Sequence, residues 1–124
     1  MSAAINKGTT AVLAEWAAGF RLEDAPDEVV QRMKALVLDF LRVTAVGARL
    51  PWSRSTRQLA LQLGGKAESS LLLCGSRIDA ARAAFVNGAY AHACDLDDTH
   101  VGSMHHAGAS ILPAVLAMAE RENS

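Results

Sequence analysis

The segment from residue 26 to residue 46 carries the longest amphipathic pattern of the chain and constrains its fold more than any other segment. Pro26 suits the first turn of a helix, and the acidic residues Asp27 and Glu28 complement the positive end of the helix dipole. Gly47 is placed to end the helix. The apolar side chains recur at helical spacing as one broad stripe, made of Val29, Val30, Met33, Leu36, Val37, Phe40, Leu41 and Thr44. Such a stripe predicts a helix that packs against other helices.

Helical spacing recurs in four further segments. They cover residues 10–19, 53–63, 79–94 and a last stretch that opens around Ser110 with Pro113 in its first turn. Thr9 or Thr10 is expected to cap the first of these helices. The 24 alanines favour helices and let them approach closely. Since only residues 69–74 read as a strand, we predict an all-α fold, a helical bundle with at most one short strand, in a single domain over residues 1–124.

The charge balance excludes one class of partner. Twelve Lys and Arg residues against thirteen Asp and Glu residues leave a net charge of −1, and the basic residues are scattered, so nothing indicates nucleic-acid binding. No apolar run approaches the roughly 18 residues that span a bilayer, and the first ten residues do not resemble a secretory signal. We therefore expect a cytoplasmic protein that binds neither nucleic acid nor a membrane.

Polar chemistry is concentrated between residues 95 and 106, which include three acids and three of the four histidines. One interpretation is a solvated loop, because Asp, Gly and Ser favour loops and loops lie on the surface. This interpretation explains the acidic residues, but a solvated loop does not need three histidines so close together. A second interpretation is a metal site, since carboxylate oxygens and imidazole nitrogens are common ligands. Its candidate ligands are Asp97, Asp98, His100, His105 and His106, although their spacing matches no specific metal site.

A third interpretation is general acid–base catalysis without a metal. An imidazole titrates near neutral pH and can take or give a proton, and a nearby carboxylate can fix its tautomer. His106 with Asp95 supplies this pair of residue types, and Thr99 would add a hydroxyl group one helical turn beyond Asp95. Spacing alone does not choose among the three interpretations.

Three stretches carry a resemblance to a known family: FVNGAYAHACDLDDTH at 85–100, SMHH at 103–106 and PAVLAMAE at 113–120. Together they closely resemble the MmgE/PrpD family, which includes 2-methylcitrate dehydratase, cis-aconitate decarboxylase and iminodisuccinate epimerase. The resemblance covers nearly the whole chain, and the block from Asn87 to Glu120 is its specific part. It implies the N-terminal part of that family's helical domain.

The resemblance also implies roles for three residues. The family's active-site aspartate falls on Asp95, and the small residue that is threonine in the decarboxylases falls on Thr99. The catalytic histidine falls on His106 when the helix that follows is kept in register. Ala107 stands where the family usually has proline, so a shift of one residue would put His105 in this place instead.

Other residues that match or flank the motif receive structural roles. We interpret Asn87, Gly88 and His92 as structural. Asp97 and Asp98 are expected to point away from the site as helix-capping groups, because further carboxylates would repel an anionic substrate.

Members of this family are several times longer and contain an inserted α/β lid domain. The resemblance therefore implies a fragment or truncated member that lacks the lid. For full-length relatives it implies homodimers and cofactor-independent, metal-free chemistry. A proton is removed next to a carboxylate of a small polycarboxylate, and the outcome is dehydration, decarboxylation or epimerisation. The alternatives are a non-catalytic helical module that self-associates and a metal-binding Asp/His site.

Overall fold

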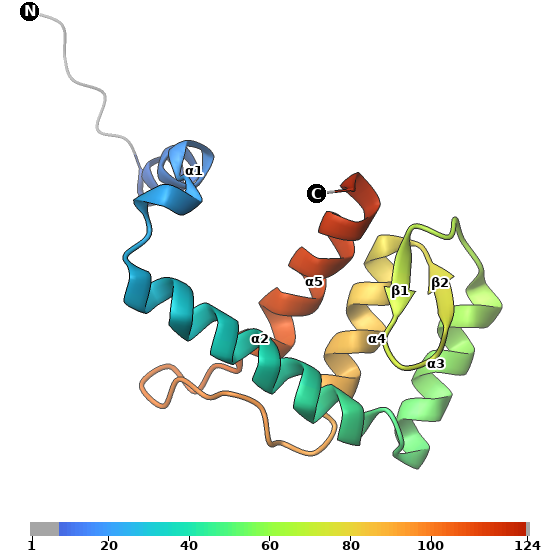
Figure 1. Ribbon diagram of the computed structural model, residues 1–124. Coiled ribbons are helices and arrows are strands. Elements are labelled where there is room, and N and C mark those ends of the chain that lie inside the picture. Colours follow the sequence, from blue (N-terminus) through green and yellow to red (C-terminus); the bar gives the residue numbers. More distant parts are fainter. Residues whose placement is uncertain (1–7, 124) are drawn as a thin grey trace, which may run out of the picture. The chain divides into compact units, whose positions relative to one another are not determined.

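The computed structural model describes residues 8–123, and this part of the chain is mostly helical, which confirms the predicted fold class (Figure 1). Its elements are α1 (Thr9–Gly19), the short 3-10 helix η1 (Leu22–Asp24), α2 (Asp27–Gly47), α3 (Pro51–Leu63), β1 (Ser69–Leu71), β2 (Ser76–Ile78), α4 (Ala80–His92) and α5 (Ala107–Glu122). The chain forms two compact units, and the boundary between them lies inside α2, after Arg32. No helix among the described residues is both long and apolar enough to cross a membrane.

The first unit holds α1 and η1. The rings of Trp16 and Phe20 are in tilted contact, with centroids 5.2 Å apart. Gly8 is the N-cap residue of α1 and no side chain caps this helix. The expected cap at Thr9 or Thr10 is therefore wrong, because the helix begins early enough to include both threonines.

In the rest of the chain, the expected helices at 26–46, 53–63 and 79–94 are confirmed as α2, α3 and α4, with ends within two residues of the prediction. The expected start of the last helix is wrong. α5 begins at Ala107, three residues before Ser110, and Pro113 lies inside the helix rather than in its first turn.

The prediction of at most one short strand is also wrong, because β1 pairs with a second strand. Ser69 lies opposite Ile78 and Leu71 opposite Ser76, so β1 and β2 form an antiparallel hairpin. Its turn requires positive φ at two residues, 63° at Leu73 and 66° at Gly75, and glycine adopts this conformation at little cost. A three-residue strand is too short to show a periodicity in the sequence, which is why β2 was not predicted.

Asn87 of α4 attaches the hairpin to the helices. Its side-chain oxygen accepts a hydrogen bond from the Leu72 backbone N–H at 3.0 Å, and its side-chain nitrogen donates to the Ser70 carbonyl at 3.0 Å. Asn87 is only 5% exposed, so these two bonds satisfy a polar group that would otherwise be costly to bury. The structural role predicted for Asn87 is therefore confirmed.

α4 and α5 lie side by side and pack closely at Gly88 (Figure 1). A Cβ atom on Gly88 would lie 2.7 Å from the Ala109 carbonyl oxygen. This carbonyl belongs to the residue four positions before Pro113, and proline has no N–H to bond to it within the helix. Gly88 and Pro113 therefore act together: proline leaves the Ala109 carbonyl without its helical donor, and glycine lets α4 approach it.

The start of α4 is fixed by Asp79, its N-cap residue. The Asp79 carboxylate accepts hydrogen bonds from the Arg82 backbone N–H at 3.2 Å and from the Arg82 guanidinium at 2.6 Å. Burial raises the pKa of this carboxyl, but the hydrogen bonds from Arg82 outweigh burial and hold the pKa below its ordinary value. The carboxylate is thus charged at neutral pH, as an N-cap requires.

Two groups of buried side chains make up the core. One surrounds Tyr90 and includes Leu71, Ile78 and Val86, while the other is made of Phe40, Val43, Ala91 and Leu112. Burial raises the pKa of the Tyr90 phenol well above its ordinary value, so it stays neutral in the core. α4 contributes to both groups, and its C-terminal end is thereby held against α5.

We predict that Gly88→Ala lowers the free energy of unfolding by about 1–3 kcal/mol, because the added methyl group would collide with the Ala109 carbonyl. Gly19→Ala is the control, since a Cβ atom there meets nothing within 4 Å. Urea denaturation followed by circular dichroism measures both. An unchanged midpoint for Gly88→Ala would contradict the close contact of the two helices.

Candidate active site

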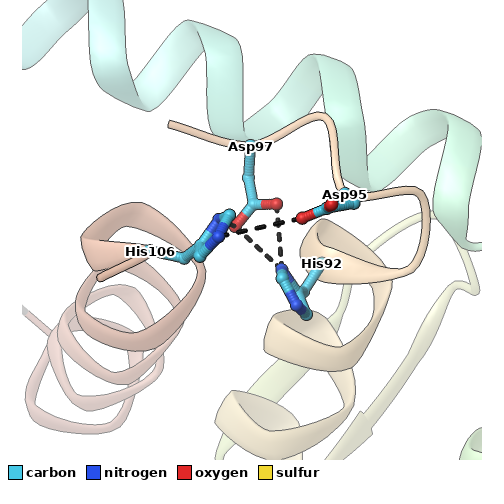
Figure 2. A group of neighbouring side chains, drawn as sticks. All are labelled: His92, Asp95, Asp97 and His106. Atoms are coloured by element: carbon cyan, nitrogen blue, oxygen red, sulfur yellow. Dashed lines mark hydrogen bonds and ion pairs between the residues drawn. The ribbon is translucent and has the colours of Figure 1, made fainter. Parts of the chain in front are cut away.

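Four side chains converge at one end of the α4–α5 pair (Figure 2). His92 is the last residue of α4, Asp95 and Asp97 lie in the loop that follows, and His106 is the N-cap residue of α5. One nitrogen or oxygen of each side chain lies within 4.8 Å of the corresponding atoms of the others. We call these four residues the Asp–His cluster.

Asp97 lies at the centre of the cluster. Its carboxylate oxygens are 3.0 and 3.2 Å from Nδ1 of His92, and Oδ2 is 3.2 Å from Nδ1 of His106. Only 3% of its side chain is exposed. Asp97 is the one charged residue in the described part of the chain that is classed as buried, so its contacts with the two imidazoles offset a substantial desolvation cost.

Asp95 lies on the outer side of His106. Its Oδ1 atom is 3.7 Å from Nε2 of His106, and 78% of its side chain is exposed. The backbone of Asp95 has a φ of 55°, in the left-handed region, and its N–H donates to the His92 carbonyl at 3.1 Å as the chain leaves α4. Non-glycine residues adopt this conformation at some cost, and such strain concentrates at functional sites.

Thr99 completes the surroundings of His106. Its hydroxyl oxygen lies 3.4 Å from Nδ1 of His106 and 3.4 Å from the Asp97 carbonyl oxygen. The structure therefore brings together Asp95, Thr99 and His106, the three site residues that the sequence predicted. Their chemical roles stay predictions.

The other two loop histidines close a turn. His100 and His105 pair through their backbones, with the His100 N–H 2.9 Å from the His105 carbonyl oxygen. The His100 side chain is engaged with the Ser103 hydroxyl at 2.8 Å. His105 is exposed and takes part in none of the side-chain contacts that join the described cluster residues. The geometry thus favours His106 over His105 as the partner of Asp95.

Asp98 caps the helix that carries His106. Its Oδ1 atom accepts a hydrogen bond from the Gly108 backbone N–H at 2.9 Å, in the first turn of α5. A Cβ atom on Gly108 would overlap this carboxylate. The capping role predicted for Asp98 is confirmed, and it accounts for the early start of α5, since a carboxylate stabilises the N–H groups of a helix N-terminus.

The expectation that Asp97 points away from the site is wrong. The reason for that expectation was the repulsion of an anionic substrate, but the Asp97 carboxylate is only 3% exposed and lies against His92 and His106. The chain leaves α4 through a left-handed conformation at Asp95, with a φ of 55°, so no periodicity in the sequence indicated that Asp97 would join the cluster.

His92 was interpreted as structural, and its hydrogen bond to the buried Asp97 carboxylate agrees with that interpretation, although it also places His92 in the cluster. Its ring centroid is 4.7 Å from that of His106, in an edge-on arrangement. A sequence signal existed, because His92 is three residues before Asp95 at the end of the predicted helix. The five metal ligands considered from the sequence are not brought together, since Asp98 and His100 are engaged elsewhere.

The donor atoms of the Asp–His cluster are nevertheless of a kind that could hold a divalent cation. Two imidazoles and two carboxylates are ligands that zinc accepts in proteins. The same atoms are already joined by contacts of 3.0–3.2 Å between Asp97 and the two imidazoles. Such contacts are hydrogen-bonding distances, so the cluster is equally suited to moving a proton.

A separate groove lies between α2, the hairpin and α5, with a volume of about 510 Å³. Its lining is mainly apolar and includes Phe40, Leu72 and Leu116, together with the ion pair of Arg77 and Glu120 at 3.9 Å. None of the four cluster residues lines it. The groove is therefore distinct from the chemistry of the Asp–His cluster.

The structure thus shows a mostly helical chain with a buried carboxylate in contact with two imidazoles. Comparison with known families shows which domain it is. The MmgE/PrpD N-terminal domain matches residues 11–124, and the chain belongs to this family. The family resemblance seen in the sequence is thereby confirmed.

The chain is also similar to several cis-aconitate decarboxylases. The chain is 34% identical over 113 residues to cis-aconitate decarboxylase of Aspergillus terreus, a match that covers 91% of this chain and 23% of that protein. It is 31% identical over 103 residues to the human cis-aconitate decarboxylase, covering 82% and 21%. The mouse enzyme is 29% identical over 115 residues, covering 92% and 23%. The chain thus spans about a quarter of the length of these relatives. No solved structure matches it.

We predict that Asp98→Ala lowers the free energy of unfolding by about 1 kcal/mol, because the Gly108 N–H loses its acceptor. Asp98→Asn is the matched variant, since its side-chain oxygen can still accept this bond. Thermal and urea unfolding should show a smaller loss for Asn than for Ala. Equal losses in the two variants would contradict the capping role.

Proposed function

We propose that this chain supplies the acid–base side of an active site that transfers a proton next to a carboxylate of a small polycarboxylate. The first candidate activity is the decarboxylation of cis-aconitate. The observation that carries the proposal is the position of His106, whose Nε2 atom lies 3.7 Å from Asp95 while its Nδ1 atom contacts Asp97 and Thr99. The similarity to cis-aconitate decarboxylases supports the choice of reaction.

The chemistry needs one group that exchanges a proton with carbon. In a decarboxylation, the bond between the carboxylate carbon and its neighbour breaks, CO2 leaves, and the electron pair that remains is protonated. In this proposal His106 transfers the proton, Asp95 is its partner or a second acid, and the Thr99 hydroxyl orients the substrate. Dehydration and epimerisation begin instead with removal of a proton from carbon, so the same residue would act first as a base. None of these steps calls for a cofactor.

A polycarboxylate also needs cationic donors to hold it. In the described part of the chain, no Lys or Arg takes part in the contacts of the Asp–His cluster. We propose that these cations come from regions that correspond to the remaining length of the relatives. The isolated chain should then turn over tricarboxylates slowly or not at all.

The test is a chimera in which residues 11–123 replace the matching segment of the Aspergillus terreus enzyme. We expect the chimera to release CO2 from cis-aconitate. His106→Ala should lower its kcat by about 10²- to 10⁴-fold, the usual contribution of a positioned proton-transfer group. His105→Ala is the matched control and should keep the activity. A folded chimera in which neither substitution changes the rate would contradict the proposal, and loss with His105→Ala alone would move the role to His105.

A second candidate is a role in self-association, which the surface of α5 favours. Ile111, Val115 and Met118 recur at helical spacing and are 53%, 56% and 44% exposed. Exposed apolar stripes of this kind are typical of interaction surfaces. We propose that the chain forms a homo-oligomer, a dimer in the simplest case, through this stripe.

We predict that the chain sediments as an oligomer at tens of micromolar and that Val115→Asp shifts it toward the monomer, because the charge would have to be desolvated in the interface. Val101→Asp is the control, since Val101 is 77% exposed and belongs to the loop instead of the stripe. A monomer in the unsubstituted chain would rule out this candidate without affecting the first.

A further inference from the structure

The Asp97 carboxylate has an unusual environment. Its side chain is 3% exposed, and the side-chain donors that reach it among residues 8–123 are the Nδ1 atoms of His92 and His106. A buried carboxylate is tolerated only when donors satisfy it. His92 Nδ1 is hydrogen-bonded to this carboxylate, and His106 Nδ1 lies 3.2 Å from it. The hydrogen bond of His106 Nδ1 is with the Thr99 hydroxyl oxygen at 3.4 Å, and this hydroxyl donates its own proton to the Asp97 carbonyl, so it accepts from Nδ1.

This requirement determines where the imidazole protons are. An ionised carboxylate only accepts hydrogen bonds, and a neutral imidazole carries its one N–H on either Nδ1 or Nε2. A lone pair on Nδ1 would face the carboxylate oxygens at 3.0–3.2 Å and be repelled. We infer that Asp97 is a positioning residue that holds both His92 and His106 as Nδ1–H tautomers.

The consequence for His106 is a defined site of proton exchange. With a proton on Nδ1, where the Thr99 hydroxyl and the Asp97 carboxylate lie, the lone pair of the neutral ring is on Nε2, 3.7 Å from Oδ1 of Asp95. A hydrogen bond at one ring nitrogen sets the protonation of the other in this way. The step from tautomer to proton transfer rests on the proposed function, whereas the tautomer itself does not.

His92 has a supporting part in this arrangement. It engages both oxygens of Asp97, at 3.0 and 3.2 Å, and so shares the carboxylate with His106. With 52% of its side chain exposed, its Nε2 atom is free to remain in contact with water. His92 therefore holds the Asp97 carboxylate in place without competing for the position beside Asp95.

A bound cation at the cluster requires the opposite tautomer for His92. A metal takes a lone pair, so ligation through the nitrogen nearest Asp97 would leave Nδ1 without a proton and put the proton on Nε2. The position of the His92 proton thus separates a carboxylate bridge from a metal centre.

The test uses long-range 1H–15N NMR spectra of the imidazoles in the 15N-labelled 124-residue chain, recorded above the pH at which histidine titrates. His100 and His105 lie outside the cluster, so a His100→Ala/His105→Ala variant leaves only the two rings of interest. We expect both to show a protonated, pyrrole-type Nδ1 and an unprotonated, pyridine-type Nε2. Nε2–H in either ring of the unsubstituted cluster would overturn the inference.

Asp97→Asn provides the second measurement. Its side-chain amide has one accepting oxygen and one donating nitrogen, so at least one ring should lose its Nδ1–H signature. Asp98→Asn is the matched control and should leave both rings unchanged. Unchanged tautomers in folded Asp97→Asn would overturn the inference, and so would stoichiometric Zn²⁺ binding that converts His92 to Nε2–H.

If Asp97→Asn does not fold, the tautomers measured in the cluster with Asp97 intact test the inference on their own. Because no turnover is measured, an inactive chimera would leave this result unaffected.

Discussion

The close contact of α4 and α5 at Gly88 sets the geometry on which the candidate site depends. α4 ends at His92 and α5 begins after His106, so the distance between the two imidazoles follows from the separation of the two helices. That separation is small because Gly88 has no side chain and because the Ala109 carbonyl is turned toward it. The two rings therefore meet with centroids 4.7 Å apart, close enough for one carboxylate to bridge them.

Some polar residues of the loop between α4 and α5 stabilise the loop and the helix, and others belong to the Asp–His cluster. Asp98 holds the N-terminus of α5, and the His100–His105 pair closes the turn. These contacts fix the direction in which His106 leaves the loop. Asp95 and Asp97 then contact the imidazoles, and the first carboxylate is exposed while the second is buried. The loop is thus held by internal hydrogen bonds, although most of residues 99–105 are exposed.

The sequence predicted the helices well because their apolar stripes and terminal residues act locally. α2, with Pro26 before its first residue and Gly47 as its last, was predicted to within one residue at each end. β2 was missed because three residues carry no periodicity. The start of α5 was missed because its cap, Asp98, is ten residues away from Gly108 in the chain. Capping by a residue so distant leaves no local signal of the S/T/D/N type that sequence rules use.

In the candidate site, too, the sequence predicted what a local motif carries and missed what depends on contacts between distant residues. The family motif led to Asp95, Thr99 and His106, which the structure brings together. It did not lead to the role of Asp97, because the burial of this carboxylate against two imidazoles depends on residues that come from both helices. Asp97 contacts His92 and His106, whereas Asp95 is exposed and approaches His106 at Nε2. Neither contact leaves a periodic pattern in the sequence. In the proposed function, the side of the His106 ring next to the buried Asp97 is fixed, and Nε2, next to the exposed Asp95, is the atom that exchanges the proton.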